Sequence, residues 1–312
     1  MADLEFRTKM NFDYGVAREI APELAPGVLR VVANNPSPFT FKGTNTYIVG
    51  TAELAVIDPG PDDPVHCEAV VRAIAGRPVS HIVLTHTHHD HYDGLDRLQD
   101  TLQAKVCGYG REAPAASSKS PVDGGERADR SFRPDVVLRH DQTIEGDGWA
   151  LTALFTPGHA PDHLCFVLGG PDRANGGATG VTFSGDHVMA WNTSVVAPPE
   201  GRMSDYLASL QRLEGRGARL YLPGHGGKLK QPERMVHAYL VHRNWRENAI
   251  YSAIQDGHRT IVDIVNLVYP GIDRRLVRAA SLSVQAHVEH LIEQNRILCD
   301  GPVTFDRQLS VA

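Results

Sequence analysis

The run Thr85-His86-Thr87-His88-His89-Asp90-His91-Tyr92-Asp93-Gly94 constrains this chain more than any other stretch of its sequence. Four histidines and two aspartates fall within eight residues. A packed core does not hold so many polar side chains, because burying each one without a partner costs free energy. A strand-like segment leads into the run and a helix-like segment follows it, so the run is expected in a loop at a strand end, where α/β folds place their sites.

The chemistry of these side chains indicates two metal ions. Imidazole and carboxylate ligands suit zinc, and they also accept iron or manganese. Alternation along an extended segment puts His86 and His88 on the same side, which suits one ion. The turn that follows presents Asp90 and His91 toward a second ion. His89, inside the run, is not assigned to metal.

Three later fragments each place one ligand-type residue beside a glycine, after an apolar strand. They are Thr156-Pro157-Gly158-His159, Ser184-Gly185-Asp186 and Pro223-Gly224-His225-Gly226. Alone, each is more typical of a turn, but with the first run in place they complete two metal shells. In the simplest assignment Asp186 bridges two ions, the first held by His86, His88 and His159 and the second by Asp90, His91 and His225.

The HxHxDH motif, followed by an isolated His, Asp and His in this order, is similar to the metallo-β-lactamase superfamily of αββα sandwiches. The resemblance spans about residues 25–235 and implies an α+β fold with the metals at one edge of two packed sheets. Asp58 matches the family's first motif, where the carboxylate supports the ligand loop; a plain turn residue is the alternative. Asp93 stands where many relatives have Gly, which weakens transfer to glyoxalase-type relatives.

The first part of the chain has the pattern of strands joined by turns, with a few helices. The polar stretch 109–134 is expected to be a surface connection or a loop bordering the site. Runs rich in β-branched residues and bounded by Pro, Gly or Asp predict the strands. Strands are expected at 28–32, 44–49, 54–57, 81–84, 105–108, 136–138, 150–155, 163–168, 181–183 and 219–222, and helices at 68–75, 95–102 and 205–213.

The pattern becomes helical after about Gln231. Helices are expected over 232–254, from Thr260 to Val268 with Thr260 as its cap, and over 273–295. A hairpin of 297–299 with 303–305, joined by an Asp-Gly turn, would follow. Helices before a terminal hairpin favour a small winged-helix module, although the tail could instead pack as a lid or dimer surface. We therefore expect a catalytic domain over residues 1–235 and a winged-helix domain over 236–312.

Composition narrows the partners and the compartment. The net charge of −6 argues against binding nucleic acid through bulk charge, and a local basic groove stays open. The cysteines are scattered and the first residues do not form a signal peptide, so a cytoplasmic protein is expected. No apolar run approaches the about 18 residues of a membrane span. A homodimer stays open, and His66, His140, His237 and His258 are expected at the surface.

The fold does not fix the substrate, because this superfamily hydrolyses lactams, lactones, thioesters and phosphodiesters. True β-lactamases usually are exported and lack the bridging carboxylate that Asp186 supplies. Asp186 and His225 are too close in sequence for the inserted domain of the long nucleases. The runs 38–47 and 242–247 are similar to the lactamase-β-like subgroup, which implies either a single-strand endoribonuclease or a thioesterase.

The sequence therefore predicts a zinc-dependent hydrolase with two ions and a metal-bridging hydroxide, acting on a thioester, an ester or a similar small molecule. Asp90 would orient the hydroxide or move a proton, and Asp186 would couple the ions. The first alternative is cleavage of single-strand RNA, for which Arg274, Arg275 and Arg278 could contact phosphate or be a solvated helix end. The second is a metal-binding or nucleic-acid-binding protein without hydrolysis, although flavodiiron relatives usually have Glu at the position of His88.

Overall fold

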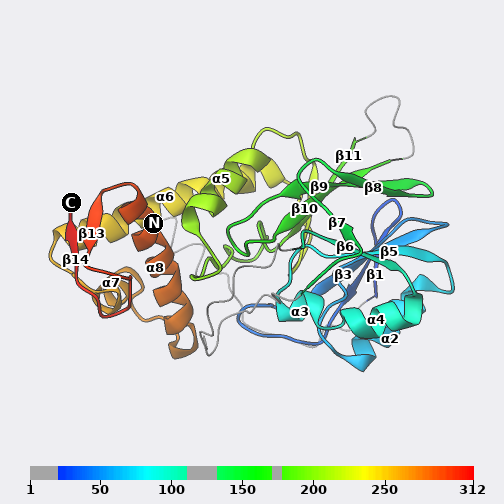
Figure 1. Cartoon of the computed structure of the whole chain (residues 1–312), viewed down its shortest axis with the longest axis horizontal. Helices are drawn as coiled ribbons and strands as arrows, with labels where there is room; N and C mark the ends of the chain where they lie inside the picture. Colours follow the sequence, from blue (N-terminus) through cyan, green and yellow to red (C-terminus); the bar gives the residue numbers. More distant parts are fainter. Residues whose placement is uncertain (1–19, 111–131, 171–177) are drawn as a thin grey trace.

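The computed structural model describes residues 20–110, 132–170 and 178–312. In these residues a seven-stranded and a five-stranded sheet pack face to face, helices cover both outer faces, and a smaller helical unit follows (Figure 1). The α+β fold predicted from the sequence, an αββα sandwich followed by a helical module with a small hairpin, is confirmed. The expected loop over 109–134 falls mainly on residues 111–131, which lie outside the described ranges.

The first sheet has its strands in chain order, antiparallel from β1 to β4 and parallel from β4 to β7. Its parallel strand Leu54–Ile57 is apolar and wholly buried, as strands covered on both faces are. Helices α2 (Pro64–Ile74) and α4 (Leu95–Leu102) cover its outer face. The strands are β1 (Ile20–Ala25), β2 (Val28–Val32), β3 (Asn45–Val49), β4 (Leu54–Ile57), β5 (Val79–Val83), β6 (Lys105–Gly108) and β7 (Val136–Val137).

The second sheet runs in the order β12-β11-β10-β9-β8, with only the β11–β12 pair parallel. Its outer face packs against α5 (Met203–Leu213) and the first half of α6 (Pro232–Gln255). Residues of both sheets, among them Val83, Phe166 and Leu222, form one apolar core between them. The strands are β8 (Thr143–Gly146), β9 (Trp149–Phe155), β10 (Leu164–Gly169), β11 (Ala178–Gly185) and β12 (Leu220–Pro223).

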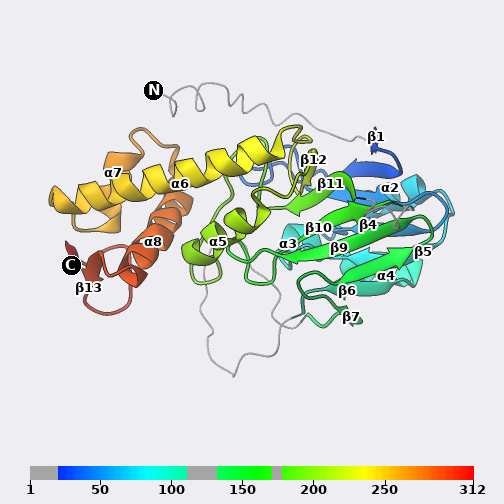
Figure 2. The same ribbon diagram turned by 90° about the horizontal axis from the view of Figure 1, so that it is seen from above.

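Helix α6 joins the sandwich to the C-terminal unit, as Figure 2 shows. Val236 and Tyr239 near its start belong to the core under the second sheet, whereas Ile250 and Ile254 belong to a separate core. One helix thus contributes to both cores, and the division of the chain at residue 235 stays a prediction. The separate core also contains α7 (Ile261–Val268), α8 (Val277–Glu293) after the short η2 (Arg274–Leu276), β13 (Ile297–Cys299) and β14 (Leu309–Val311).

The predicted hairpin partner was wrong. Strand β13 pairs with Leu309–Val311, not with 303–305. The segment 303–305 instead packs against α7, where the carbonyl of Phe305 accepts a hydrogen bond from Val262 N at 3.4 Å. The sequence pattern favoured the nearest run with β-branched residues, Val303-Thr304-Phe305, whereas tertiary packing selected Leu309-Ser310-Val311, in which only Val311 is β-branched. Strands β1 and β8 were not predicted, while Thr260 caps α7 as expected, its side chain accepting from Asp263 N.

No helix in the described ranges is long and apolar enough to cross a membrane. The four cysteines are free, and Cys67, Cys107 and Cys165 are buried.

Two leucines of the terminal hairpin test this strand assignment. Leu309 is 1% exposed, whereas Leu298 is 57% exposed. Leu309→Ala should lower the free energy of unfolding by about 2–5 kcal/mol because it leaves a cavity in the core. Leu298→Ala should change it by less than about 0.5 kcal/mol. Urea unfolding of both variants measures the difference, and equal effects would contradict the observed pairing.

Candidate metal centre

All seven residues predicted to bind metal follow the carboxyl end of a strand. His86, His88, Asp90 and His91 follow β5, the last two within the short helix α3 (His89–Tyr92). His159 follows β9, Asp186 follows β11 and His225 follows β12. The structure brings these side chains together in three overlapping groups, within each of which the ligand atoms lie within 4.8 Å of one another: His86, His88 and His159; His86, His91 and Asp186; Asp90, His91 and His225.

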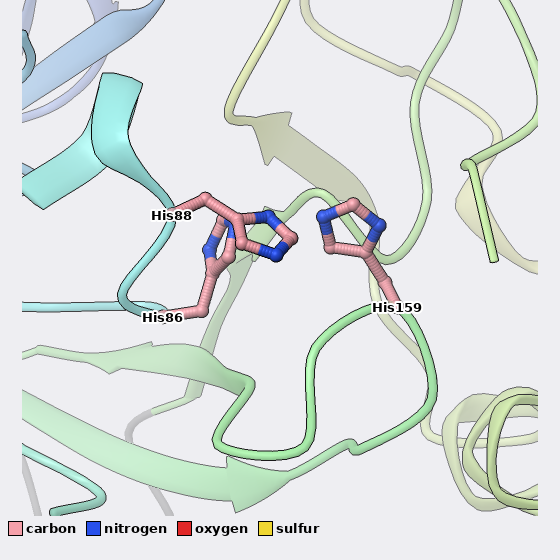
Figure 3. A group of neighbouring side chains, drawn as sticks. All are labelled: His86, His88 and His159. Atoms are coloured by element: carbon pink, nitrogen blue, oxygen red, sulfur yellow. The ribbon is translucent and has the colours of Figure 1, made fainter. Parts of the chain in front are cut away.

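The first group consists of three converging imidazoles (Figure 3). His86 Nε2 lies 3.1 Å from His88 Nδ1. Thr85 Oγ1 accepts from His86 Nδ1 at 2.9 Å, and the carbonyl of Val195 accepts from His159 Nδ1 at 2.6 Å, which leaves the Nε2 lone pairs directed into the group. Burial and the neighbouring imidazoles hold the pKa of His86 and of His88 well below the ordinary value. Neutral nitrogen atoms therefore face one another here.

The second group, formed by Asp90, His91 and His225, combines two imidazoles with carboxylates. His91 Nε2 lies 3.3 Å from His225 Nε2, and Asp90 Oδ2 lies 3.5 Å and 3.3 Å from these two nitrogens. Burial disfavours the imidazolium of His225, but the carboxylates of Asp186 and Asp90 outweigh it and raise the pKa to about 10. The pKa of His91 also lies well above its ordinary value for the same reason. This half of the site attracts positive charge.

Asp186 lies between this second group and the group of His86, His88 and His159, and it links one histidine of each, His91 and His86, in the remaining group. Its Oδ2 is 3.1 Å from His225 Nε2 and 3.8 Å from His159 Nε2, and its Oδ1 is 3.5 Å from His91 Nε2. Burial opposes its ionisation, but His225 and His91 hold the pKa of its carboxyl well below the usual range. An ionised carboxylate thus reaches both groups.

The arrangement fits a pair of divalent cations. Asp186 Oδ1 is buried and makes no hydrogen bond within the described part of the chain, and the nearest ionisable group, His91 Nε2, lies 3.5 Å away. Imidazole nitrogens and carboxylate oxygens are the donor set that zinc, iron and manganese accept. Unpaired buried acceptors and facing nitrogen lone pairs are costly without a cation between them.

Asp58 supports both groups from behind. Its carboxylate accepts from Thr85 N, from Thr85 Oγ1 and from His91 Nδ1, at 2.8, 2.8 and 2.9 Å. Thr85 Oγ1 in turn accepts from His86 Nδ1, so one carboxylate orients a histidine of each group. Asp58 is 2% exposed and has a left-handed backbone with φ of 54°. Its placement matches the supporting role that the resemblance implied, not a plain turn residue.

Thr44 and Asn45 brace the site from the first sheet. Thr44 Oγ1 donates to Asp90 Oδ2 at 2.8 Å. Asn45 N donates to Gly224 O at 2.7 Å, and Asn45 Nδ2 donates to Pro223 O at 2.8 Å, which holds the loop that carries His225. Both lie in the run 38–47 that the sequence marked only through its resemblance to a subgroup, so no residue pattern indicated these contacts.

Two buried histidines near the site were missed by the sequence reasoning. His163 Nε2 accepts from the backbone N–H of Asp186 at 3.1 Å, and His163 Nδ1 lies 2.9 Å from Thr156 Oγ1. His187 is buried beside Tyr206, with ring centroids 4.6 Å apart. Their sequence surroundings resemble those of a strand start and a turn, and nothing in them separates a supporting histidine from a ligand.

His66 was predicted at the surface, and this was wrong. It is 3% exposed and its Nε2 lies 2.8 Å from Thr46 Oγ1, which donates to Asp58 O at 2.6 Å. Burial lowers the pKa of His66 to about 4, so the ring is neutral. It fills the space beside Gly60, where a Cβ atom would lie 2.6 Å from His66 Nε2. His66 thus packs against the turn that carries Asp58.

Comparison with known proteins identifies the family. The model of the metallo-beta-lactamase superfamily matches residues 39–225, and that of the beta-lactamase associated winged helix domain matches residues 260–301. The chain belongs to the metallo-beta-lactamase superfamily. Superfamily members of known structure have the same fold: a metallo-beta-lactamase family protein from Thermus thermophilus is 26% identical, with a TM-score of 0.71, covering 93% of this chain and 100% of that one.

Two relatives are similar to this chain over most of its length. The "Beta-lactamase-like protein 2 homolog" of Caenorhabditis elegans is 31% identical over 79% of this chain and 78% of its own length. An "Atrochrysone carboxyl ACP thioesterase" of Aspergillus fumigatus is 30% identical over 76% of this chain and 67% of its own length. The similarity to both relatives therefore extends beyond the ligand motifs.

Gly224 offers a test of the site that removes no ligand. A Cβ atom there would lie 2.3 Å from Asp186 Oδ1 and 2.6 Å from His91 Cε1, whereas at Gly227 it would meet nothing within 4 Å. Gly224→Ala should displace both side chains and lower catalytic activity by about 100-fold. Gly227→Ala in the same loop should leave activity and metal content unchanged. Metal analysis and steady-state kinetics compare the two, and a fully active Gly224→Ala variant would contradict this geometry.

Asp58→Asn should weaken metal binding without removing a ligand. The amide keeps the shape of the side chain, but it is neutral. It has one acceptor oxygen and cannot accept all three of the hydrogen bonds that the carboxylate accepts. Loss of such an outer contact costs about 10–100-fold in metal affinity. Asp62→Asn is the matched control, because Asp62 is exposed and pairs with Arg97. Competition with a metal-binding dye measures both affinities, and an unchanged value for Asp58→Asn would count against its supporting role.

Proposed function

We propose that this chain is a metal-dependent hydrolase with two metal ions, acting on a thioester or a related small ester. The observation that carries the proposal is Asp186, whose carboxylate reaches both groups of histidines. We assign His86, His88 and His159 to one ion and Asp90, His91 and His225 to the other, with Asp186 shared. When bound, two divalent ions supply a hydroxide nucleophile at neutral pH and polarise the substrate oxygen. Zinc is the proposed metal, and iron or manganese suit the same ligands.

The residues around the ions have distinct roles in this proposal. Asp90 accepts from Thr44 Oγ1 and lies at the more exposed side of the site, with a side chain 20% exposed. It is therefore placed to orient the nucleophile or to move a proton to the leaving group. Asp186, 4% exposed, is held by His163 through its backbone and fixes the spacing of the two groups. No serine or cysteine nucleophile is required.

A thioester substrate is favoured by two observations. Relatives from Aspergillus fumigatus and Passalora fulva carry the name atrochrysone carboxyl ACP thioesterase, and the alignment with the latter covers 91% of this chain. The basic cluster that could serve RNA is partly neutralised, because Arg275 forms an ion pair with Asp273 at 2.7 Å. A cytoplasmic location belongs to the same proposal and is supported by the free cysteines, which suit a reducing compartment.

The decisive experiment gives the metal-loaded chain S-lactoylglutathione and, separately, labelled single-strand RNA. We expect hydrolysis of the thioester, its loss on chelation and its recovery with added zinc or manganese. Asp186→Asn should lower kcat/KM by more than about 100-fold, beyond the 10–100-fold cost of an outer contact, because a shared ligand is weakened. Asp256→Asn, an exposed change of the same kind, is the control.

Cleavage of RNA without the thioester would favour the nuclease alternative. Cleavage of neither by fully metal-loaded protein would contradict hydrolysis of these two classes.

A further inference from the structure

A cavity of about 450 Å³ lies between the sandwich and the C-terminal unit. It is lined by Pro38 and Phe39, the loop 189–195, one face of α6 and the start of α8. It adjoins the metal centre, because Val195 in this loop accepts the hydrogen bond from His159 Nδ1. Trp191 of the same loop packs against Gly226, directly after His225. The cavity therefore borders the segments that carry His159 and His225.

Arg243 on α6 lines this cavity and is buried, with 3% of its surface exposed. Its guanidinium donates to Ser194 O and lies 5.1 Å from the ring centroid of Tyr206. Its Nε meets no acceptor, and among the described residues no carboxylate forms an ion pair with it. A buried charge without a counter-charge is unfavourable, because one carbonyl and one aromatic ring do not replace its lost hydration. An anion that enters the cavity would remove this cost.

The rest of the cavity lining adds to the positive charge. Arg246, three residues along the same helix, is also 3% exposed and lies 4.1 Å from the ring centroid of Tyr269. Among the described residues that line the cavity, Asp273 is the one carboxylate, and it is already held by Arg275 through its side chain and its backbone N–H. The cavity therefore presents cationic groups, and its acid is neutralised.

The side of the cavity near the loop of His225 is aromatic. Trp191 stacks on Phe41, with ring centroids 5.1 Å apart, and Phe39 lines the same side. An apolar or flat part of a substrate would lie here, between the bond to be cleaved and the anionic group.

We propose that Arg243, with Arg246, forms an anion subsite for the substrate of the metal centre. The substrate would be a thioester or ester that carries a phosphate or a carboxylate beyond an apolar portion. The His242-Arg243-Asn244-Trp245-Arg246-Glu247 run then has a function, because its two buried arginines set specificity by contact with that oxyanion. This inference rests on the proposed hydrolysis, and the experiment separates the two.

The test uses matched substrate pairs with the metal-loaded full chain. 4-(Acetylthio)phenyl phosphate is compared with 4-(acetylthio)anisole, and 4-(acetylthio)benzoate with 4-(acetylthio)benzamide, so that in each substrate a flat ring lies beside the thioester and, in the charged member, between it and the anion. We expect wild-type kcat/KM to favour the anionic member of one pair by about 10–100-fold, the range of a charge-assisted hydrogen bond. The pair that shows the preference identifies phosphate or carboxylate as the source of the anion.

Arg243→Gln should abolish this preference, and Arg243→Lys should retain part of it. A structural role alone would lower both members of a pair equally and leave the ratio unchanged. Arg234→Gln, an exposed change on the same helix, should alter neither rate. Equal rates for both members in the wild type, or an unchanged ratio in Arg243→Gln, would overturn the subsite.

If no thioester is hydrolysed, the proposed function fails and the subsite is judged by binding alone. Calorimetric titration of phenyl phosphate and of benzoate then compares the wild type with Arg243→Gln and Arg246→Gln. Weaker binding by at least about tenfold in the variants supports the subsite, and equal binding overturns it. Arg243→Lys serves in both assays if the Gln variant does not fold.

Discussion

Five imidazoles and two carboxylates converge at one edge of two sheets, and this crowding is the constraint on which the structure depends. Facing nitrogens such as His86 Nε2 and His88 Nδ1 approach within 3.1 Å. In a dry interior facing nitrogen lone pairs and carboxylates are costly, and the two divalent cations that we propose would satisfy them together. The fold meets this demand by ending β5, β9, β11 and β12 at the same place.

Orientation of the ligands depends on a few atoms behind them. Asp58 accepts three hydrogen bonds and through them directs His86 and His91, one from each group. His163 does the equivalent for Asp186 from the second sheet, by accepting its backbone N–H. Each sheet thus carries its own support, and Asn45 of the first sheet joins them by holding the loop of His225. The candidate metal site is therefore also the place where hydrogen bonds connect the two sheets.

The candidate ligands could be predicted from the sequence because their chemistry is local and rare. His86, His88, Asp90 and His91 stand in one run, and each later ligand follows an apolar strand beside a glycine. Supporting residues could not be found in this way, since His163 and His66 have no distinguishing neighbours and act through contacts between distant segments. The prediction of the terminal hairpin failed for a related reason: the β-branched run 303–305 looked more strand-like than 309–311, and only packing in the core beside α8 selects Leu309.

Helix α6 has a role that neither its periodicity nor its family resemblance indicated. Its 24 residues join two cores, so buried side chains at its middle face the space between them. Arginine suits this position, because its planar guanidinium lies over the ring of Tyr206 or Tyr269 and still has several N–H groups that can donate to an anion. Because α6 connects it to the sandwich, the winged-helix unit can contribute to function without binding nucleic acid. By packing beside the sandwich it closes the cavity next to the metal centre and supplies its far wall.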